Sequence, residues 1–269
     1  MQFIPACCIV FLLMLTTSCE KVIDVTLNNA EKKYVIEGVL TNQPGNCVVL
    51  LSQTKDFDDN NEFAGVSGAT IQITEQGGAT TLLTESSTGV YQATTLSGSS
   101  GKTYELSVAI NGQSFTATSA MPQQVNMDSI FVTNDNVRGN TRKLVNVQYK
   151  DPVTTGNNYR FIQYVNGLKE QQIFIRNDEL TNGNTSITPL RYPRSDEDEN
   201  NIQQGDQVKV DMLCIDAAVY KYWYSLNRSA TGGGGQMSAT PANPVTNIQG
   251  GALGYFSAHT LQSKTMRVQ

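Results

Sequence analysis

Cys19 is the residue whose surroundings most clearly indicate chemistry. It follows an unbroken apolar run at 4–15 and three small polar residues at 16–18. The run is shorter than the ~20 residues of a membrane-spanning helix, but it fits the ~7–15-residue core of a secretion signal. We therefore expect 1–18 to be a lipoprotein signal peptide and Cys19 to carry a covalent lipid. The alternative is an ordinary cleaved signal with a chance cysteine. Met1–Pro5 departs from the usual form of a signal in having no Lys or Arg.

A short acidic stretch offers the oxygen ligands that calcium requires. Its alternating oxygen-bearing side chains are Asp56, Asp58, Asn60 and Glu62. Hard Ca²⁺ takes about 6–8 oxygen ligands, often from alternate positions of a loop. Here, however, Asn61 replaces the turn glycine and Ser67 replaces the bidentate glutamate of such a loop. The sequence favours a solvated loop, so we expect no metal site and keep Ca²⁺ as the alternative.

Groups for catalysis are sparse. His259 is the only histidine, and beyond the expected signal peptide no closely spaced cysteine pair could complete a zinc site with it. No Gly-x-Ser-x-Gly sequence occurs, so a nucleophilic serine is not indicated. We expect no enzymatic activity and no cofactor. The alternative is a surface hydrolase that uses carboxylates, for which the candidates are Asp56, Asp58, Asp196 and Asp198.

An aromatic cluster near the C-terminal end is the candidate surface for a ligand or partner. Apolar side chains with the spacing of one helical face predict a helix over about 216–230, with Asp216 capping its N-terminus. Such a helix buries only one face, which leaves aromatic side chains outside. We take Tyr220, Trp223 and Tyr224 as candidates for this surface, because exposed aromatics anchor interfaces and stack on sugars. The alternative is that the cluster packs on a sheet.

The remaining cysteines and the composition bound the class of protein. Cys47 and Cys214 are far apart in the sequence, and we expect two buried free thiols instead of a disulfide. The net charge is −5 with only 19 Lys and Arg residues, which argues against a nucleic-acid partner. Charged residues make up 16%, and a polar, uncharged, turn-rich composition takes their place. This composition favours extracellular β structure.

Two β-rich domains should follow a tether at 19–32. The first, 33–122, contains about seven short strands separated by turns, which predicts a β-sandwich. Its clearest strand is Tyr104–Ile110, and the following Asn111-Gly112 predicts a tight hairpin.

The second domain, 123–269, should be β-rich with the helix inserted. Asn166-Gly167 predicts a hairpin between Tyr159–Val165 and Gln171–Ile175. Leu253–Ser257 and Lys264–Val268 are expected as the last strands. The fold class is therefore mainly β, with two β-sandwich domains of immunoglobulin-like or transthyretin-like type and one α-helix in the second.

Several stretches resemble a known family. They are 18–25 (SCEKVIDV), 34–38 (YVIEG), 215–226 and 250–263. In this order and spacing they are similar to the Bacteroidetes lipoproteins called domain of unknown function 4249. The first domain also resembles transthyretin-like, carboxypeptidase-regulatory sandwiches in 68–73, 89–91 and 101–104. The family resemblance implies an outer-membrane lipoprotein, often encoded beside a TonB-dependent transporter, and it assigns no catalytic residues.

The leading functional hypothesis is a lipid-anchored accessory protein of the outer membrane. It would bind a ligand or partner a TonB-dependent transporter in nutrient uptake, with either the periplasmic or the cell-surface face as its location. A structural or adhesive surface lipoprotein is the second hypothesis, and a surface hydrolase the third.

Overall fold

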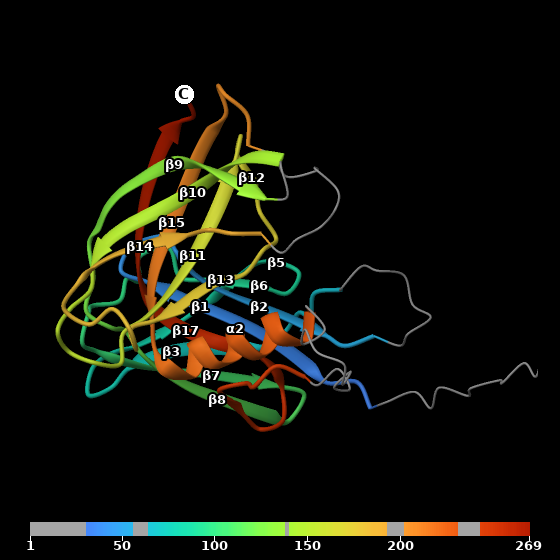
Figure 1. Ribbon diagram of the computed structural model, residues 1–269. Helices are drawn as coiled ribbons and strands as arrows, with labels where there is room; N and C mark the ends of the chain where they lie inside the picture. Colours follow the sequence, from blue (N-terminus) through green and yellow to red (C-terminus); the bar gives the residue numbers. More distant parts are fainter. Residues whose placement is uncertain (1–30, 56–63, 138–139, 193–201, 231–242) are drawn as a thin grey trace, which may run out of the picture. The chain divides into compact units, whose positions relative to one another are not determined.

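Alternation of buried and exposed side chains organises most of this chain into β-strands, as the composition predicted. The computed structural model describes residues 31–55, 64–137, 140–192, 202–230 and 243–269. Several sheets and the helix α2 are present, so the expectation of a mainly β sandwich protein with a helix is confirmed (Figure 1). Cys19 and the expected tether as far as residue 30 lie outside the described residues.

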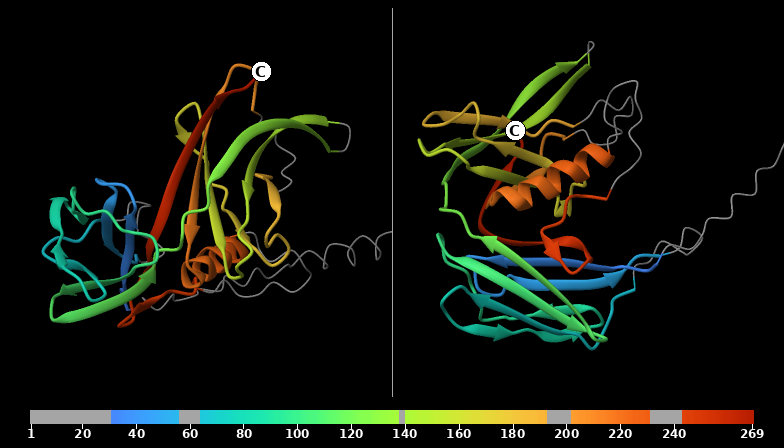
Figure 2. Two further views of the ribbon diagram at one scale, coloured as in Figure 1. Left: turned by 90° about the vertical axis from the view of Figure 1, so that its left-hand side faces the viewer. Right: turned by 90° about the horizontal axis from the view of Figure 1, so that it is seen from below.

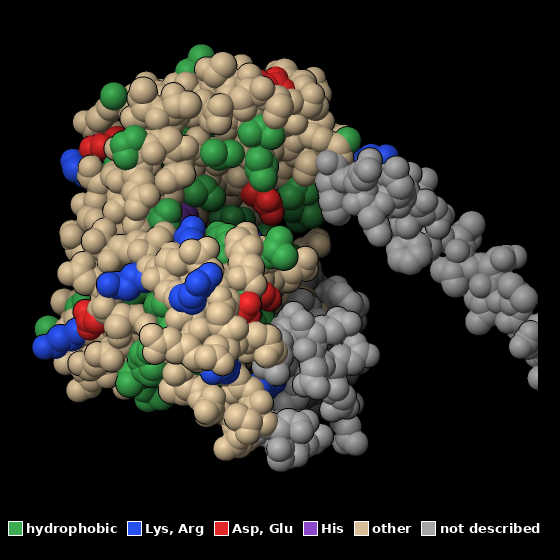
Figure 3. Space-filling view, turned by 90° about the horizontal axis from the view of Figure 1, so that it is seen from above, with side chains coloured by type: hydrophobic (Ala, Val, Ile, Leu, Met, Phe, Trp, Pro, Cys, Tyr) green, Lys and Arg blue, Asp and Glu red, His purple; other side chains and the backbone are tan. Residues whose placement is uncertain are grey.

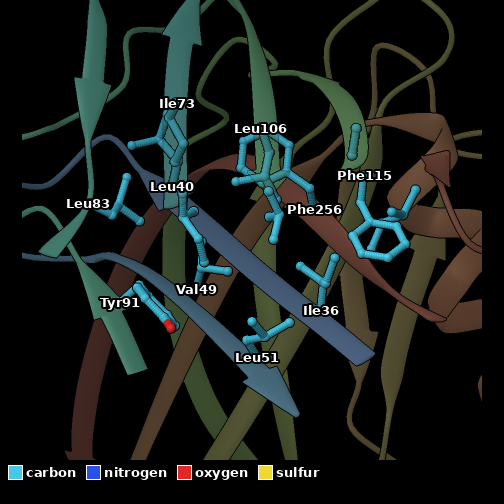
Figure 4. Packing of buried hydrophobic residues seen from close by; sticks show 14 of the residues in the cluster. Ile36, Leu40, Val49, Leu51, Ile73, Leu83, Tyr91, Leu106, Phe115 and Phe256 are labelled. Atoms are coloured by element: carbon cyan, nitrogen blue, oxygen red, sulfur yellow. The ribbon is translucent and has the colours of Figure 1, made fainter. Parts of the chain in front are cut away.

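The first core lies between two sheets. One layer contains β1 (Tyr34–Thr41), β2 (Cys47–Gln53), β5 (Thr84–Ser87) and β6 (Val90–Gln92). The facing layer contains β3 (Thr70–Glu75), β4 (Thr80–Leu82), β7 (Thr103–Ile110), β8 (Gln113–Ala120) and β16 (Ile248–Gln249). Figure 2 shows β1 and β2 lying over β7 and β8. Inward-facing side chains of both layers interdigitate in this core, including Ile36, Leu40, Val49, Leu106 and Phe256 (Figure 4).

The second core also lies between two sheets. One layer contains β11 (Asn158–Val165), β12 (Leu168–Lys169), β13 (Phe174–Asn177) and β15 (Gln207–Ile215). The facing sheet has the order β14 (Thr185–Pro189), β10 (Asn140–Lys150) and β9 (Met127–Val137). Tyr149, Tyr159 and Phe161 pack at its centre, and the Tyr149 and Tyr159 ring centroids are 4.8 Å apart.

The long strand β17 (Leu253–Arg267) joins the two cores. Its first half pairs in parallel with β1, from Val35 opposite Leu253 to Thr41 opposite His259. Its second half pairs antiparallel with β15, beginning with Cys214 opposite Thr260. The expectation of two separate strands, Leu253–Ser257 and Lys264–Val268, is therefore wrong. Residues 258–262 are buried or half-buried, and the exposed Ser263 continues the ladder opposite Asp211, so no turn interrupts the strand.

β17 also bears on the expected domain organisation. It contributes Phe256 and Ala258 to the first core, and its Met266 packs against the second. The last strand of the expected second domain is thus also a central strand of the first core. The boundary near residue 122 stays a prediction.

The helix α2 (Ala217–Ala230) lies within the expected range and packs against β11, β13 and β17 (Figure 1). Asp216 Oδ1 accepts a hydrogen bond from the Val219 N–H at 2.8 Å, which confirms the expected cap. Its Oδ2 accepts bonds from Ser119 Oγ at 2.5 Å and from the Ala120 N–H at 3.2 Å. One carboxylate therefore starts the helix and ties it to β8. No helix in the described ranges is long and apolar enough to span a membrane.

Both expected hairpin turns are present. Asn111 and Asn166 have φ of 48° and 51°, and the glycine after each also has positive φ, as tight two-residue hairpins require. The second hairpin differs from the expectation in its return strand. Residues 168–169 form β12, residues 171–173 are irregular, and 174–177 form β13, which pairs separately with β11.

Candidate functional site

Several of the sequence-predicted site residues fall outside the described ranges. They are Cys19 and the calcium candidates Asp56, Asp58, Asn60 and Glu62, together with the hydrolase candidates Asp196 and Asp198. In the part of the chain that the structure describes, no group of three or more His, Cys, Asp or Glu side chains is arranged to hold a metal ion. The candidate site must therefore be built from other residues.

Through β17, the layer of β1, β2, β5 and β6 and the layer of β11, β12, β13 and β15 form one large sheet. A groove of about 530 Å³ lies on one face of this sheet, where β17 changes partner from β1 to β15. Alternation along each strand determines which side chains line it. The lining includes Val39 and Thr41 of β1, Val48 of β2, Arg160, Ile162 and Tyr164 of β11, Lys169 of β12, Lys209, Asp211, Leu213 and Ile215 of β15, Trp223 of α2, and Tyr255, Ser257, His259, Leu261 and Ser263 of β17. Figure 3 looks onto a hollow with hydrophobic side chains in its depth and the purple of the histidine beside them. We call this feature the groove.

The floor of the groove is apolar. Val39 and Val48 come from the first half of the sheet, and Leu213, Ile162 and Leu261 from the second. None of them belongs to the two cores: Leu213 is buried in a small third cluster, against which Ile162 and Leu261 pack. Val39, Val48, Ile162 and Leu261 are half-buried, so part of their surface is available to an apolar ligand. Pockets of about 300–1,000 Å³ with apolar linings and a few polar groups are typical of small-molecule sites.

Arg160 is the most unusual group in the groove. Its Cζ lies 3.3 Å from the centroid of the Trp223 ring, so the guanidinium stacks on the indole. Its Nε is buried and has no hydrogen-bond partner among the described residues. Burial lowers the pKa of the Arg160 guanidinium, and the neighbouring Tyr255 opposes that shift. The described part of the chain offers Arg160 no carboxylate within ion-pair distance.

The other charged groups of the groove are partly compensated. Lys209 Nζ lies 3.2 Å from Asp211 Oδ1 and 4.5 Å from the centroid of the Tyr164 ring. Asp211 Oδ1 also accepts a hydrogen bond from Ser263 Oγ at 2.5 Å. Burial lowers the pKa of Lys169, and the charge of Arg160 lowers it further. Among the described residues, the ion pair of the groove is that of Lys209 with Asp211. Arg160 and Lys169 have no carboxylate within ion-pair distance there, and of these two Arg160 is the more deeply buried.

His259 lies in the groove beside Ser257. The Ser257 Oγ and His259 Nδ1 are 2.8 Å apart, and the histidine is only 4% exposed. Burial lowers the pKa of His259 to about 3, with a further contribution from the charge of Arg160. The imidazole is therefore neutral at pH 7 and a poor general base, because efficient base catalysis needs a pKa near the working pH. This serine–histidine pair fits a polar wall of a binding site better than a nucleophilic centre.

The predicted aromatic surface is divided between two places. Tyr220 and Tyr224 stack with ring centroids 6.0 Å apart, and Tyr224 is 44% exposed. Arg228 Nη1 donates a hydrogen bond to Tyr224 Oη at 3.1 Å, which extends this stack along the helix. Trp223 instead faces the groove and contacts Tyr255, with ring centroids 5.1 Å apart. We call Tyr220, Tyr224 and Arg228 the helix surface.

Both described cysteines are buried free thiols, as expected. Burial raises the pKa of Cys47 to about 11 and also raises that of Cys214. The two thiols lie in different cores. They are therefore packing residues and take no part in the groove.

Sequence reasoning missed the groove residues Arg160, Lys209, Asp211 and Tyr255. The alternation in 208–214 places Lys209 and Asp211 on one face of a strand, and this signal could have marked them as a polar face. The alternation does not reveal that β11, β15 and β17 are adjacent strands of one sheet. The groove forms only because these strands lie side by side.

Comparison with known proteins identifies one related family. A family model described as a domain of unknown function (DUF4249) matches residues 20–265. No curated protein matches the chain.

Proposed function

Because the chain belongs to the family described as a domain of unknown function (DUF4249), as its sequence motifs predicted, we propose that it is a lipid-anchored accessory protein of the outer membrane. In this proposal it binds a small ligand and works beside a TonB-dependent transporter in nutrient uptake. A Bacteroidetes origin and a transthyretin-like first sandwich belong to the same proposal. They rest on the sequence resemblance.

The observation that carries the proposal is the groove. It combines an apolar floor, a stacked cation and a neutral histidine in about 530 Å³. Ligand sites usually combine an apolar floor with a few polar groups that point toward the ligand. The poor basicity expected of His259 favours binding over hydrolysis at this place.

Lipid attachment at Cys19 is the proposed anchor. Fourteen residues separate Cys19 from the start of β1 at Tyr34. Even a fully extended chain spans at most ~3.6 Å per residue, so the first sheet would stay within about 50 Å of the membrane. Cys19→Ala tests the anchor: we expect the variant to leave the membrane fraction, whereas Cys47→Ala should remain in it. Retention of the Cys19→Ala variant in washed membranes would contradict lipid anchoring.

The helix surface is the proposed contact with the transporter. The exposed Tyr224 stacks on the half-buried Tyr220 and lies next to Arg228, and tyrosine and arginine are enriched at protein interfaces. We expect affinity purification of the tagged protein from mild detergent to recover a TonB-dependent barrel, identified by mass spectrometry. Tyr224→Ala should reduce this recovery. Leu82→Ala, which changes another exposed apolar side chain on β4, should not.

Recovery of the lipoprotein alone under these conditions would contradict the partnership with a transporter. Equal recovery of the barrel with Tyr224→Ala would contradict the assignment of the helix surface. A deletion strain that keeps nutrient uptake but loses attachment would favour the structural or adhesive alternative.

A further inference from the structure

We infer that the groove takes an organic monoanion, a carboxylate with an apolar body, whose carboxylate pairs with Arg160. This inference deepens the proposed function and rests on it, since it names the ligand class of the same site. It follows from the state of Arg160, the charge balance of the groove and the chemistry of its floor.

The first argument is the missing partner of Arg160. Its Nε is buried without a hydrogen-bond acceptor among the described residues, and none of their carboxylates pairs with the guanidinium. Taking a cation out of water is costly unless an anion and hydrogen bonds compensate it. The groups that face it are aromatic and uncharged: Trp223 covers one face, and the side chain of Tyr255 hydrogen-bonds to the guanidinium, which still leaves Nε without an acceptor. An anionic ligand would supply the missing acceptors.

The second argument is geometric. Stacking on Trp223 holds the guanidinium plane in one orientation. A guanidinium presents its N–H groups as a rigid fork that matches a carboxylate with two parallel hydrogen bonds. A carboxylate is therefore favoured over a single hydroxyl acceptor.

The third argument is charge. Among the residues that the structure describes, the cations that line the groove are Arg160, Lys169 and Lys209. The anions are Asp211, which lines the groove and contacts Lys209, and the exposed Glu37, whose charge acts on Lys169. This leaves an excess of one positive charge, because a neutral His259 adds none. One negative charge on the ligand restores the balance, whereas a dianion would exceed it.

The fourth argument concerns the rest of the ligand. Val39, Val48 and Leu261 line the floor, with Trp223 and Tyr255 at the wall. An apolar body of aliphatic or aromatic character gains by covering these side chains, because apolar surface is then removed from water. A small inorganic anion would leave that surface exposed.

Calorimetric titration of the full chain with three matched probes tests the inference. The probes are 4-phenylbutyrate, 4-phenylbutan-1-ol and 4-phenylbutylamine, which share a body and differ in charge. We expect the carboxylate to bind about 10- to 100-fold more tightly than the alcohol, as a charge-assisted hydrogen bond implies. The amine should bind most weakly. This comparison needs no variant and is unaffected by any folding defect.

Two variants assign the preference to Arg160. Arg160→Met should bring the carboxylate to the affinity of the alcohol and leave the alcohol unchanged. Arg160→Lys keeps the charge but loses the fork, and it should keep a reduced preference for the carboxylate. Arg142→Met is the matched control, because it removes the same charge from β10. Arg142 Nε lies 3.7 Å from Asp135 Oδ2, and this variant should change the affinity for none of the probes.

The outcomes separate this inference from the proposed function. Equal affinity for the carboxylate and the alcohol would overturn the anion preference and leave ligand binding in the groove standing. Tightest binding of the amine would overturn it in the same way. A carboxylate preference that survives in Arg160→Met would overturn the role of Arg160. Binding of none of the three probes would contradict both the inference and the proposed ligand site.

Discussion

Replacing His259 should flatten the pH dependence of stability in a predictable window. In the folded protein, burial lowers the pKa of His259 to about 3, against an ordinary value of 6.5. Below pH 6.5 the unfolded chain takes up a proton at this residue, whereas the folded chain does so only near pH 3. The unfolded state therefore binds more protons, and the free energy of unfolding falls as the pH decreases from about 6.5 to about 3.

The magnitude follows from the two pKa values. With 6.5 in the unfolded chain and about 3 in the folded one, this residue lowers the free energy of unfolding by about 2 kcal/mol between pH 8 and pH 5. The loss reaches about 3 kcal/mol at pH 4. Because the chain has no other histidine, the loss between pH 7 and pH 5 is readily assigned.

Urea unfolding of the wild type and of His259→Asn, measured from pH 8 to pH 4, provides the assay. The amide cannot titrate, and its polar atoms can replace Nδ1 as partner of Ser257. The difference between the unfolding free energies of the two proteins at pH 8 reflects the substitution itself. The change of this difference with pH reports the titration of His259. Carboxylates titrate in both proteins and cancel in the difference. A difference that stays constant from pH 8 to pH 4 would refute the reasoning, because it would mean that His259 titrates alike in both states.

Further predictions concern the helix cap, one glycine and the thiols. Asp216→Ala should lower the free energy of unfolding by about 2–4 kcal/mol, because it removes the helix cap and two hydrogen bonds to β8. Thermal unfolding of the variant measures this loss, and a loss below about 1 kcal/mol would contradict the prediction. Gly254→Ala should lower the free energy of unfolding by roughly 3 kcal/mol or more, because Gly254 has a φ of +97° and a Cβ there would lie 2.0 Å from the backbone oxygen of Ile36 in β1. Gly112→Ala is the control, with positive φ but open space, and should cost only about 1–2 kcal/mol; equal losses would exclude the close approach as the cause. Cys47 and Cys214 should react with a thiol reagent at pH 8 only after unfolding in urea, because both are buried with raised pKa values, and rapid reaction of the folded protein would contradict their burial.

Local signals in the sequence predicted the elements of the fold well. Alternation in 104–110, the turn at Asn111-Gly112 and the change to a helical period after Asp216 each depend on neighbouring residues only. Such features are set by backbone preference and by which face is buried, so they can be read without knowing the partner strands.

Pairing between distant strands could not be read in this way. β1 and the first half of β17 are parallel neighbours, although residues 35–41 and 253–259 lie at opposite ends of the described chain. Alternation shows that each strand has a buried face but not which strand lies beside it. Two separate final strands were expected for the same reason, because a continuous strand that changes partner looks like two patterns.

The candidate site was accessible from the sequence only in part. The helical spacing identified the aromatic residues, but it could not place Trp223 in the groove and Tyr224 on the outside. Arg160 lies in an ordinary strand pattern, and its importance comes from the missing partner, which is a property of the folded surroundings.

Methyl NMR spectroscopy of the full chain during titration with 4-phenylbutyrate tests most directly whether the groove is a ligand site. The floor residues Val39, Leu213 and Leu261 line the groove, whereas Val49 and Ile73 lie in the first core. We predict progressive shifts of the floor methyl signals with core signals unchanged. Shifts confined to other parts of the molecule, or none at saturating probe, would contradict the account.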